Sequence, residues 1–183
     1  SNSWTWIASL ARSKSEVLYP LPQMVTVLVL AVTVLSCRHF GTDTPIQDTL
    51  PDLPVSYTID LMSSEGRSIA SPQTAILIIT PRHQSDLLGV GGVLVCHGLP
   101  GEVEGGGYAA YDAQCPLCYP TAGVVRPDYV PAMETLMSAT CDKCGAVYDL
   151  SLGVGQQIRK DLPAAVLKRY PAMVRGRDLI IGY

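Results

Sequence analysis

Two pairs of cysteines are the residues of this chain best suited to carry chemistry. Each pair has the spacing C-x-x-C, and 22 residues separate the first pair from the second. A tight turn in each pair brings two thiolates together, and four thiolates are the donor set of tetrahedral zinc sites, with bonds of about 2.3 Å, and of iron–sulfur sites. The spacing therefore predicts one metal centre with the ligands Cys115, Cys118, Cys141 and Cys144.

The sequence also allows these thiols to have roles other than metal binding. In an exported protein they can form disulfides, for which four cysteines allow three pairings and leave Cys96 over. A redox dithiol at Cys115 needs a helix N-terminus to lower its pKa, and the residues after Cys118 start a helix poorly. Cys96 and His97 are adjacent in a predicted strand and point to opposite faces, so we expect Cys96 to be a buried thiol rather than a ligand.

Short strands are the elements predicted to position the cysteines. Apolar residues alternate with polar ones over 55–61, which is typical of a half-buried strand. Further strands are predicted over 75–80, 92–96, 108–113, 135–141, 145–150, 166–174 and 179–183, and the last two form a hairpin. No helical period extends over ten residues after residue 36. We therefore predict an all-β fold, a sandwich or barrel.

Composition excludes several classes of function. The chain has 183 residues, of which 48% are hydrophobic and 16% charged, so most of it can build a core and one folded domain is expected. A net charge of -3 without a basic block argues against a nucleic-acid partner. Three histidines and no Ser-His-Asp-like motif leave little general base chemistry, so we do not expect a stand-alone enzyme.

An apolar run near the beginning of the chain resembles a secretion signal. Residues 24–36 are nearly all apolar, but a membrane-spanning helix needs about 20 such residues. The run fits the apolar part of a signal peptide, and the sequence VLSC at 34–37 resembles the cleavage box of bacterial lipoproteins. That resemblance implies a lipid anchor on Cys37. The alternative is a buried strand or helix in which Cys37 is a small apolar residue.

The lipoprotein interpretation divides the chain into three parts. Residues 1–36 are the leader, 37–54 are a proline-containing tether, and 55–183 are the folded domain. The protein is then attached to a membrane by its lipid, in the cell envelope, on the periplasmic side or at the outer membrane.

The residues around both cysteine pairs resemble the two cluster-binding loops of Rieske proteins. The segments that carry the resemblance are YAAYDAQCP at 108–116 and TCDKCGAVYDLSLG at 140–153. The final hairpin is also similar to that family, in particular to its divergent lipoprotein branch in Gram-negative bacteria. The resemblance covers roughly residues 55–183 and is most specific in the second loop. It implies an antiparallel β-sandwich or barrel with a small Cys-loop subdomain, a 2Fe-2S cluster, and electron transfer with a redox protein partner.

The ligand set departs from the Rieske pattern. Rieske loops present Cys-x-His and Cys-x-x-His, whereas Leu117 and Cys144 stand at the two histidine positions here. Cys118 can complete an all-cysteine site for a 2Fe-2S cluster or for zinc. Alternatively, a disulfide closes the loops and no metal is bound. The first interpretation implies a Rieske-like electron-transfer lipoprotein, and the rival is a non-redox binding or structural module stabilised by zinc or disulfides.

Polar residues beside the cysteines have simpler roles available. We expect Asp112, Asp142 and Asp149 to cap turns through bonds to the backbone rather than to act as acids or bases. Tyr111 and Tyr148 alternate within predicted strands, so we expect them in the core, with a hydrogen bond to a cluster sulfur as the alternative role.

Overall fold

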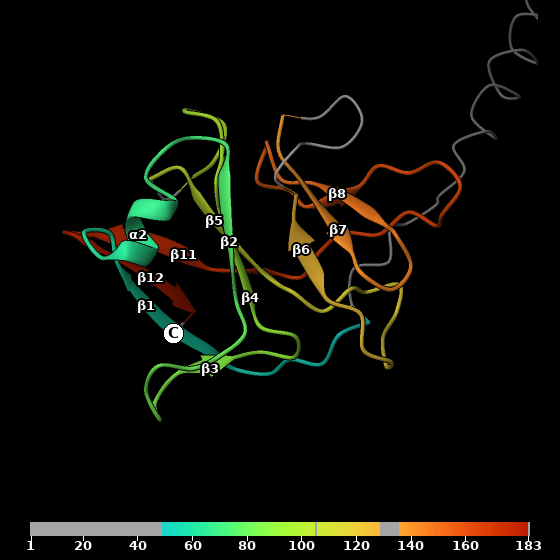
Figure 1. Ribbon diagram of the computed structural model, residues 1–183, viewed down its shortest axis with the longest axis horizontal. Helices are drawn as coiled ribbons and strands as arrows, with labels where there is room; N and C mark the ends of the chain where they lie inside the picture. Colours follow the sequence, from blue (N-terminus) through green and yellow to red (C-terminus); the bar gives the residue numbers. More distant parts are fainter. Residues whose placement is uncertain (1–48, 105, 129–135, 183) are drawn as a thin grey trace, which may run out of the picture. The chain divides into compact units, whose positions relative to one another are not determined.

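The computed structural model describes residues 49–104, 106–128 and 136–182, shown as the coloured ribbon in Figure 1. The predicted leader and the lipidation residue Cys37 lie outside this part of the chain. Within it, twelve strands form three antiparallel sheets of four strands, and one short helix is present. The prediction of an all-β fold is confirmed, and the strand orders of the three sheets are open rather than closed into a barrel.

The first sheet contains the predicted C-terminal hairpin. Its strand order is β11-β12-β1-β3. The bounds are β1 (Val55–Asp60), β3 (Leu87–Leu88), β11 (Ala172–Arg175) and β12 (Asp178–Gly182). Alternate residues of β1 are buried, so the period-two pattern in the sequence corresponds to one face turned to the core.

The second sheet lies between the other two, as Figure 1 shows, and carries the longest buried strands. Its order is β10-β5-β4-β2. The bounds are β2 (Thr74–Ile78), β4 (Val93–His97), β5 (Tyr108–Asp112) and β10 (Arg169–Tyr170). Along β4, Leu94 belongs to one hydrophobic core and Val95 to another. Both faces of this sheet are therefore covered, which explains the unbroken apolar runs of β4 and β5.

The third sheet carries the second cysteine pair. Its order is β6-β7-β8-β9, and its bounds are β6 (Val125–Pro127), β7 (Ser138–Cys141), β8 (Val147–Asp149) and β9 (Gln156–Gln157). Val125, Ala139 and Tyr148 pack into the core that this sheet shares with β4 and β5. β7 and β8 form a hairpin, and residues 142–146 are its turn.

Several short elements were not predicted. β3, β6 and β9 have only two or three residues, too few for a period to appear in the sequence. The helix α2 (Ser64–Ser68) has five residues and is started by Ser63, whose Oγ accepts a hydrogen bond from the Gly66 N–H at 3.1 Å. In the described ranges, no helix has the length and apolar character to cross a membrane.

The described end of the predicted tether lies against the domain. Leu50 is 6% exposed, and the Thr49 hydroxyl donates to the Pro116 carbonyl at 3.3 Å. The Lys168 ammonium donates to the Pro51 carbonyl at 2.8 Å and forms an ion pair with Asp52. Residues 49–52 are thus attached next to the first cysteine loop, and the boundaries predicted at 37 and 55 stay a prediction.

Candidate metal centre

The first cysteine pair lies on a tight loop that follows β5. The Cys115 N–H donates to the Gly123 carbonyl at 2.8 Å, so the two arms of the loop are paired at its base. Inside the loop, the N–H groups of Cys118 and Tyr119 both donate to the Cys115 carbonyl, at 3.1 and 3.2 Å. This turn places the two cysteine side chains close together, as the C-x-x-C spacing predicted.

In the second pair, Cys141 ends β7 and Cys144 lies on the turn between β7 and β8. The Gly145 N–H donates to the Cys141 carbonyl at 3.0 Å, and the Cys141 N–H donates to the Ala146 carbonyl at 2.9 Å. Gly145 has a φ of 68°, a conformation that glycine adopts without strain. The Arg159 guanidinium donates to the Gly145 carbonyl at 2.9 Å and fixes the turn from outside.

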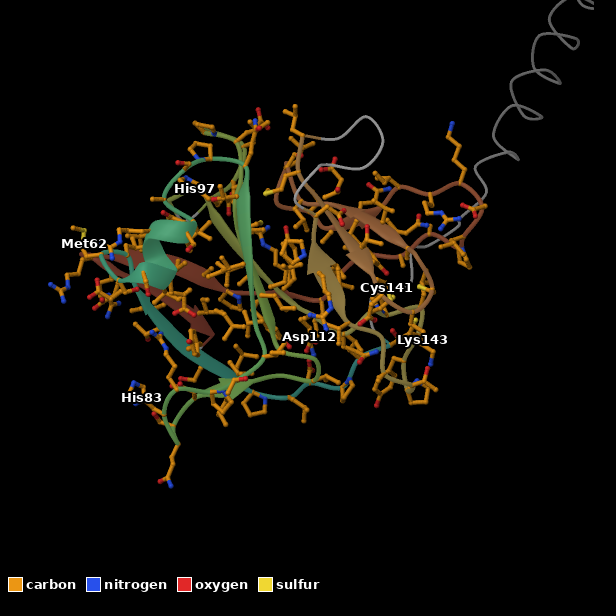
Figure 2. The ribbon with its side chains drawn as sticks, in the orientation of Figure 1. Met62, His83, His97, Asp112, Cys141 and Lys143 are labelled. Carbon is orange, nitrogen blue, oxygen red and sulfur yellow. The ribbon has the colours of Figure 1, made fainter. Side chains whose placement is uncertain are left out.

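Polar contacts join the two loops. The Val124 N–H donates to the Asp142 carboxylate at 2.9 Å, and the Asp142 N–H donates to the Val124 carbonyl at 3.0 Å. The Lys143 ammonium donates to the Thr121 hydroxyl at 2.7 Å. Figure 2 shows Cys141 at the end of β7 and Lys143 on the turn that follows. Asp142 therefore bonds to backbone and holds the loops together, in keeping with the structural role expected for it.

The four sulfurs form one compact cluster. All four Sγ atoms lie within 4.8 Å of one another. The Sγ atoms of Cys115 and Cys144 are 3.7 Å apart, and those of Cys118 and Cys141 are 3.8 Å apart. A disulfide bond is about 2.05 Å long, so these cysteines are present as free thiols. The cluster can hold a metal ion, as the spacing of the two pairs predicted.

Burial and neighbouring groups set the protonation of the thiols. Burial, and after it the neighbouring thiols, raise the pKa of Cys115 to about 11 against an opposing hydrogen bond from Tyr148. Burial and the adjacent thiols likewise raise the pKa of Cys118. Burial also acts to raise the pKa of Cys144, but the Ala146 N–H and hydrogen bonds from the other thiols outweigh it and lower that pKa. The cluster therefore holds Cys144 toward the thiolate form.

Tyr148 is both a core residue and a partner of the cluster. Its ring is fully buried, and its hydroxyl lies 3.2 Å from the Cys115 Sγ. Burial and this contact raise the pKa of Tyr148, so the hydroxyl keeps its proton and can donate it to a thiolate. Tyr111 is equally buried, but its hydroxyl has no hydrogen-bond partner among the described residues.

Gly123 is a residue of the site that the sequence did not reveal. A Cβ built on it would lie 2.9 Å from the Cys118 Sγ and 3.3 Å from the Cys141 Sγ. The bare backbone therefore closes one side of the cluster against two of the four sulfurs. No spacing rule predicts this, because the contact depends on how the two loops meet.

The other candidate ligands lie apart from the cluster. His97 is in β4, where its Nδ1 is 2.9 Å from the Ile69 carbonyl oxygen and its ring stacks on Tyr108. Figure 2 shows His83 and His97 well away from Cys141. Cys96 is fully buried in β4, as expected, and contacts the Leu150 carbonyl at 3.9 Å. Across the described ranges, the cysteine pairs form the one group of His, Cys, Asp and Glu side chains close enough to share a metal.

We compared the chain with protein-family models, curated proteins and solved structures, and found no match. The resemblance to Rieske proteins therefore stays a prediction based on the residues of the two loops.

Proposed function

We propose that this protein is a non-redox β module whose four clustered cysteines bind one zinc ion with a structural role. The observation that carries the proposal is the separation of the sulfurs. Four ligands at about 2.3 Å from one ion, arranged as a tetrahedron, lie about 3.8 Å from one another. The Sγ separations of 3.7 Å between Cys115 and Cys144 and of 3.8 Å between Cys118 and Cys141 agree with that geometry, and each joins one loop to the other.

The compact cluster favours one ion over a 2Fe-2S cluster. In a 2Fe-2S cluster, two irons with bridging sulfides stand between two pairs of thiolates. Sulfurs on opposite irons must therefore lie farther apart than sulfurs around a single ion. Separations within 4.8 Å throughout the site leave little room for a second metal.

The donor set supports a structural role for the ion. Thiolates select zinc and iron among the available metals, and four protein ligands leave no position for water or substrate. The ion would join the loop that follows β5, in the second sheet, to the β7–β8 hairpin of the third sheet. Because the unfolded chain has no such site, the free energy of metal binding would add to the free energy of unfolding.

Metal analysis of the full chain, purified without chelators and without oxygen, tests the proposal. We expect one zinc per chain, no visible absorption bands, and a lower melting temperature after removal of the metal. Re-addition of zinc, but not of magnesium, should restore the original melting temperature. Iron with an equal amount of sulfide and visible bands would contradict the zinc proposal and identify an electron carrier.

Electron transfer through a 2Fe-2S cluster is the second candidate, because Tyr148 contacts a candidate ligand. Hydrogen bonds to cluster sulfurs tune the potential of iron–sulfur centres, and the Tyr148 hydroxyl is 3.2 Å from the Cys115 Sγ. This function requires the two cysteine loops to move apart when the cluster is inserted. It would make the chain a Rieske-like carrier with a redox protein partner, as the sequence resemblance implies.

We also propose that lipid attached to Cys37 holds the module at a membrane of the cell envelope. The support is the apolar run at 24–36 and the lipoprotein-like box that ends at Cys37. Labelling of expressing bacteria with a radioactive fatty acid should mark the protein, and Cys37→Ala should abolish the label. Equal labelling of both proteins would exclude this anchor.

A further inference from the structure

Asp112 is a buried carboxylate that receives four hydrogen bonds. It ends β5 and is fully buried. The N–H groups of Val90, Gly91 and Gln114 donate to it at 2.8, 2.9 and 2.7 Å, and the Tyr170 hydroxyl donates at 2.5 Å. None of the ion pairs in the described residues includes it. A buried charge is unfavourable unless hydrogen bonds satisfy it. These four donors therefore hold the carboxylate in one fixed position.

The bonds of Asp112 fix the direction in which the chain leaves β5. The Gln114 N–H donates to the carboxylate two residues before it, which is an Asx turn. The Gln114 side-chain amide then donates to the carbonyls of Cys115 and Thr121, at 3.2 and 3.0 Å. Gln114 is 6% exposed, so solvent does not replace these bonds. One continuous set of bonds therefore runs from Asp112 to the backbone of the first metal loop.

The neighbouring loop approaches this carboxylate too closely for side chains. A Cβ on Gly89 would lie 2.7 Å from Asp112 Oδ2 and 2.3 Å from the Tyr170 hydroxyl. A Cβ on Gly91 would lie 2.4 Å from the Gln114 nitrogen. The two glycines allow the N–H groups of residues 90 and 91 to reach the carboxylate. Asp112 thereby connects three parts of the chain, residues 89–91, residues 112–114 and Tyr170.

We propose that Asp112 is a positioning residue of the metal centre. It holds the Cys115 turn in the geometry needed for metal binding before the ion arrives and keeps it there afterwards. This inference rests on the proposed zinc site and extends it to a residue that is not a ligand. Outer residues that orient metal ligands typically change metal affinity by about 10- to 100-fold when they are removed.

The rate of zinc release from the full chain tests the inference. Asp112→Asn keeps the shape of the side chain but removes acceptors for the N–H donors. We expect zinc to transfer to a chromogenic chelator about 10- to 100-fold faster than from the wild type. We also expect a shifted ligand-field spectrum after cobalt(II) substitution, which a general loss of stability would not produce in a folded chain.

Asp149→Asn is the matched control. Asp149 makes the same type of turn at the end of β8, where it accepts the Ser151 N–H at 2.8 Å, but this turn lies outside both cysteine loops in the chain. It should lower stability without changing the cobalt spectrum or the zinc release rate. If Asp112→Asn does not fold, Gln114→Met tests the positioning role instead. It removes only the hydrogen bonds from the Gln114 side-chain amide to the carbonyls of Cys115 and Thr121. It should accelerate zinc release in the same direction, by a smaller factor.

The outcomes separate this inference from the proposed function. Wild-type release rates and an unchanged cobalt spectrum in the folded Asp112 variant, or in the Gln114 variant, would overturn the positioning role while the zinc site stands. Failure of the wild-type chain to bind zinc or cobalt would overturn the zinc site, and the positioning role with it.

Discussion

The sulfurs of Cys115 and Cys144 lie 3.7 Å apart although 29 positions separate the two residues in the chain. One residue follows a strand of the second sheet, and the other is in a turn of the third. A metal ion bound between them would close a long loop and would join the second sheet to the third.

Loss of one ligand should unfold or strongly destabilise the domain. We expect Cys141→Ser to abolish stoichiometric zinc and to lower the free energy of unfolding by more than about 4 kcal/mol, the range typical of losing a metal. Cys96→Ala is the control, since Cys96 is buried apart from the cluster. It should keep its zinc. Chemical denaturation with zinc analysis of the folded fraction measures both effects. An unchanged denaturation midpoint for Cys141→Ser would exclude a metal ion that links the two cysteine loops.

A methyl group at Gly123 should disturb the site although all four cysteines are kept. Its Cβ would lie 2.7 Å from the Cys118 Cβ and 3.3 Å from the Cys141 Sγ. We expect Gly123→Ala to destabilise the protein by about 1–3 kcal/mol through overpacking and to weaken zinc binding in a chelator competition. Ala122→Ser at the exposed neighbouring position should have no effect. Equal zinc affinity of wild type and Gly123→Ala would show that the cluster does not need this close approach.

Two buried tyrosines should respond differently to loss of the hydroxyl. Tyr148→Phe removes the hydrogen bond to the Cys115 sulfur and should cost about 0.5–1.5 kcal/mol. Tyr111→Phe removes a buried hydroxyl with no partner among the described residues, so it should be neutral or stabilising. Urea denaturation of both zinc-loaded variants measures the difference. If both variants lose the same free energy of unfolding, the contact between the Tyr148 hydroxyl and the Cys115 sulfur is not stabilising.

Stability should fall in alkaline solution, in part through Tyr57. Burial, then the nearby Glu65 carboxylate, raise its pKa from 10.0 to about 12, against an opposing effect of Arg82. The folded protein therefore favours the neutral phenol. This contribution is complete below the unfolded pKa and is lost as the pH rises from about 10 through about 12.

The matched variant for this effect is Tyr57→Phe, which cannot ionise. Its free energy of unfolding should decrease less steeply than that of the wild type between about pH 9 and about pH 11. The slopes are compared rather than the absolute values, because the variant also loses the contact between the hydroxyl and Glu65 at 3.3 Å. Parallel curves would show that Tyr57 ionises equally in both states.

Local features with a clear spacing or apolar run were predictable, whereas two-residue strands and long-range contacts were not. The C-x-x-C spacing indicated which four cysteines lie together, because each turn is set by residues within a few positions. The apolar run of β4 indicated a buried strand for the same reason. By contrast, the partners of Asp112 include Val90 and Tyr170, which are 22 and 58 positions away. Such contacts depend on the packing of whole sheets, for which one sequence offers no pattern.

The order of the second sheet has a consequence for how the protein exchanges its amide hydrogens. β4 and β5 are internal strands with neighbours on both edges, and their side chains enter two separate cores. Their amides can meet deuterium only when both cores open, so they should exchange last. The β7–β8 hairpin borders one core and the metal loops. Removal of the ion should therefore accelerate deuterium uptake in the hairpin first and leave the centre of the molecule protected.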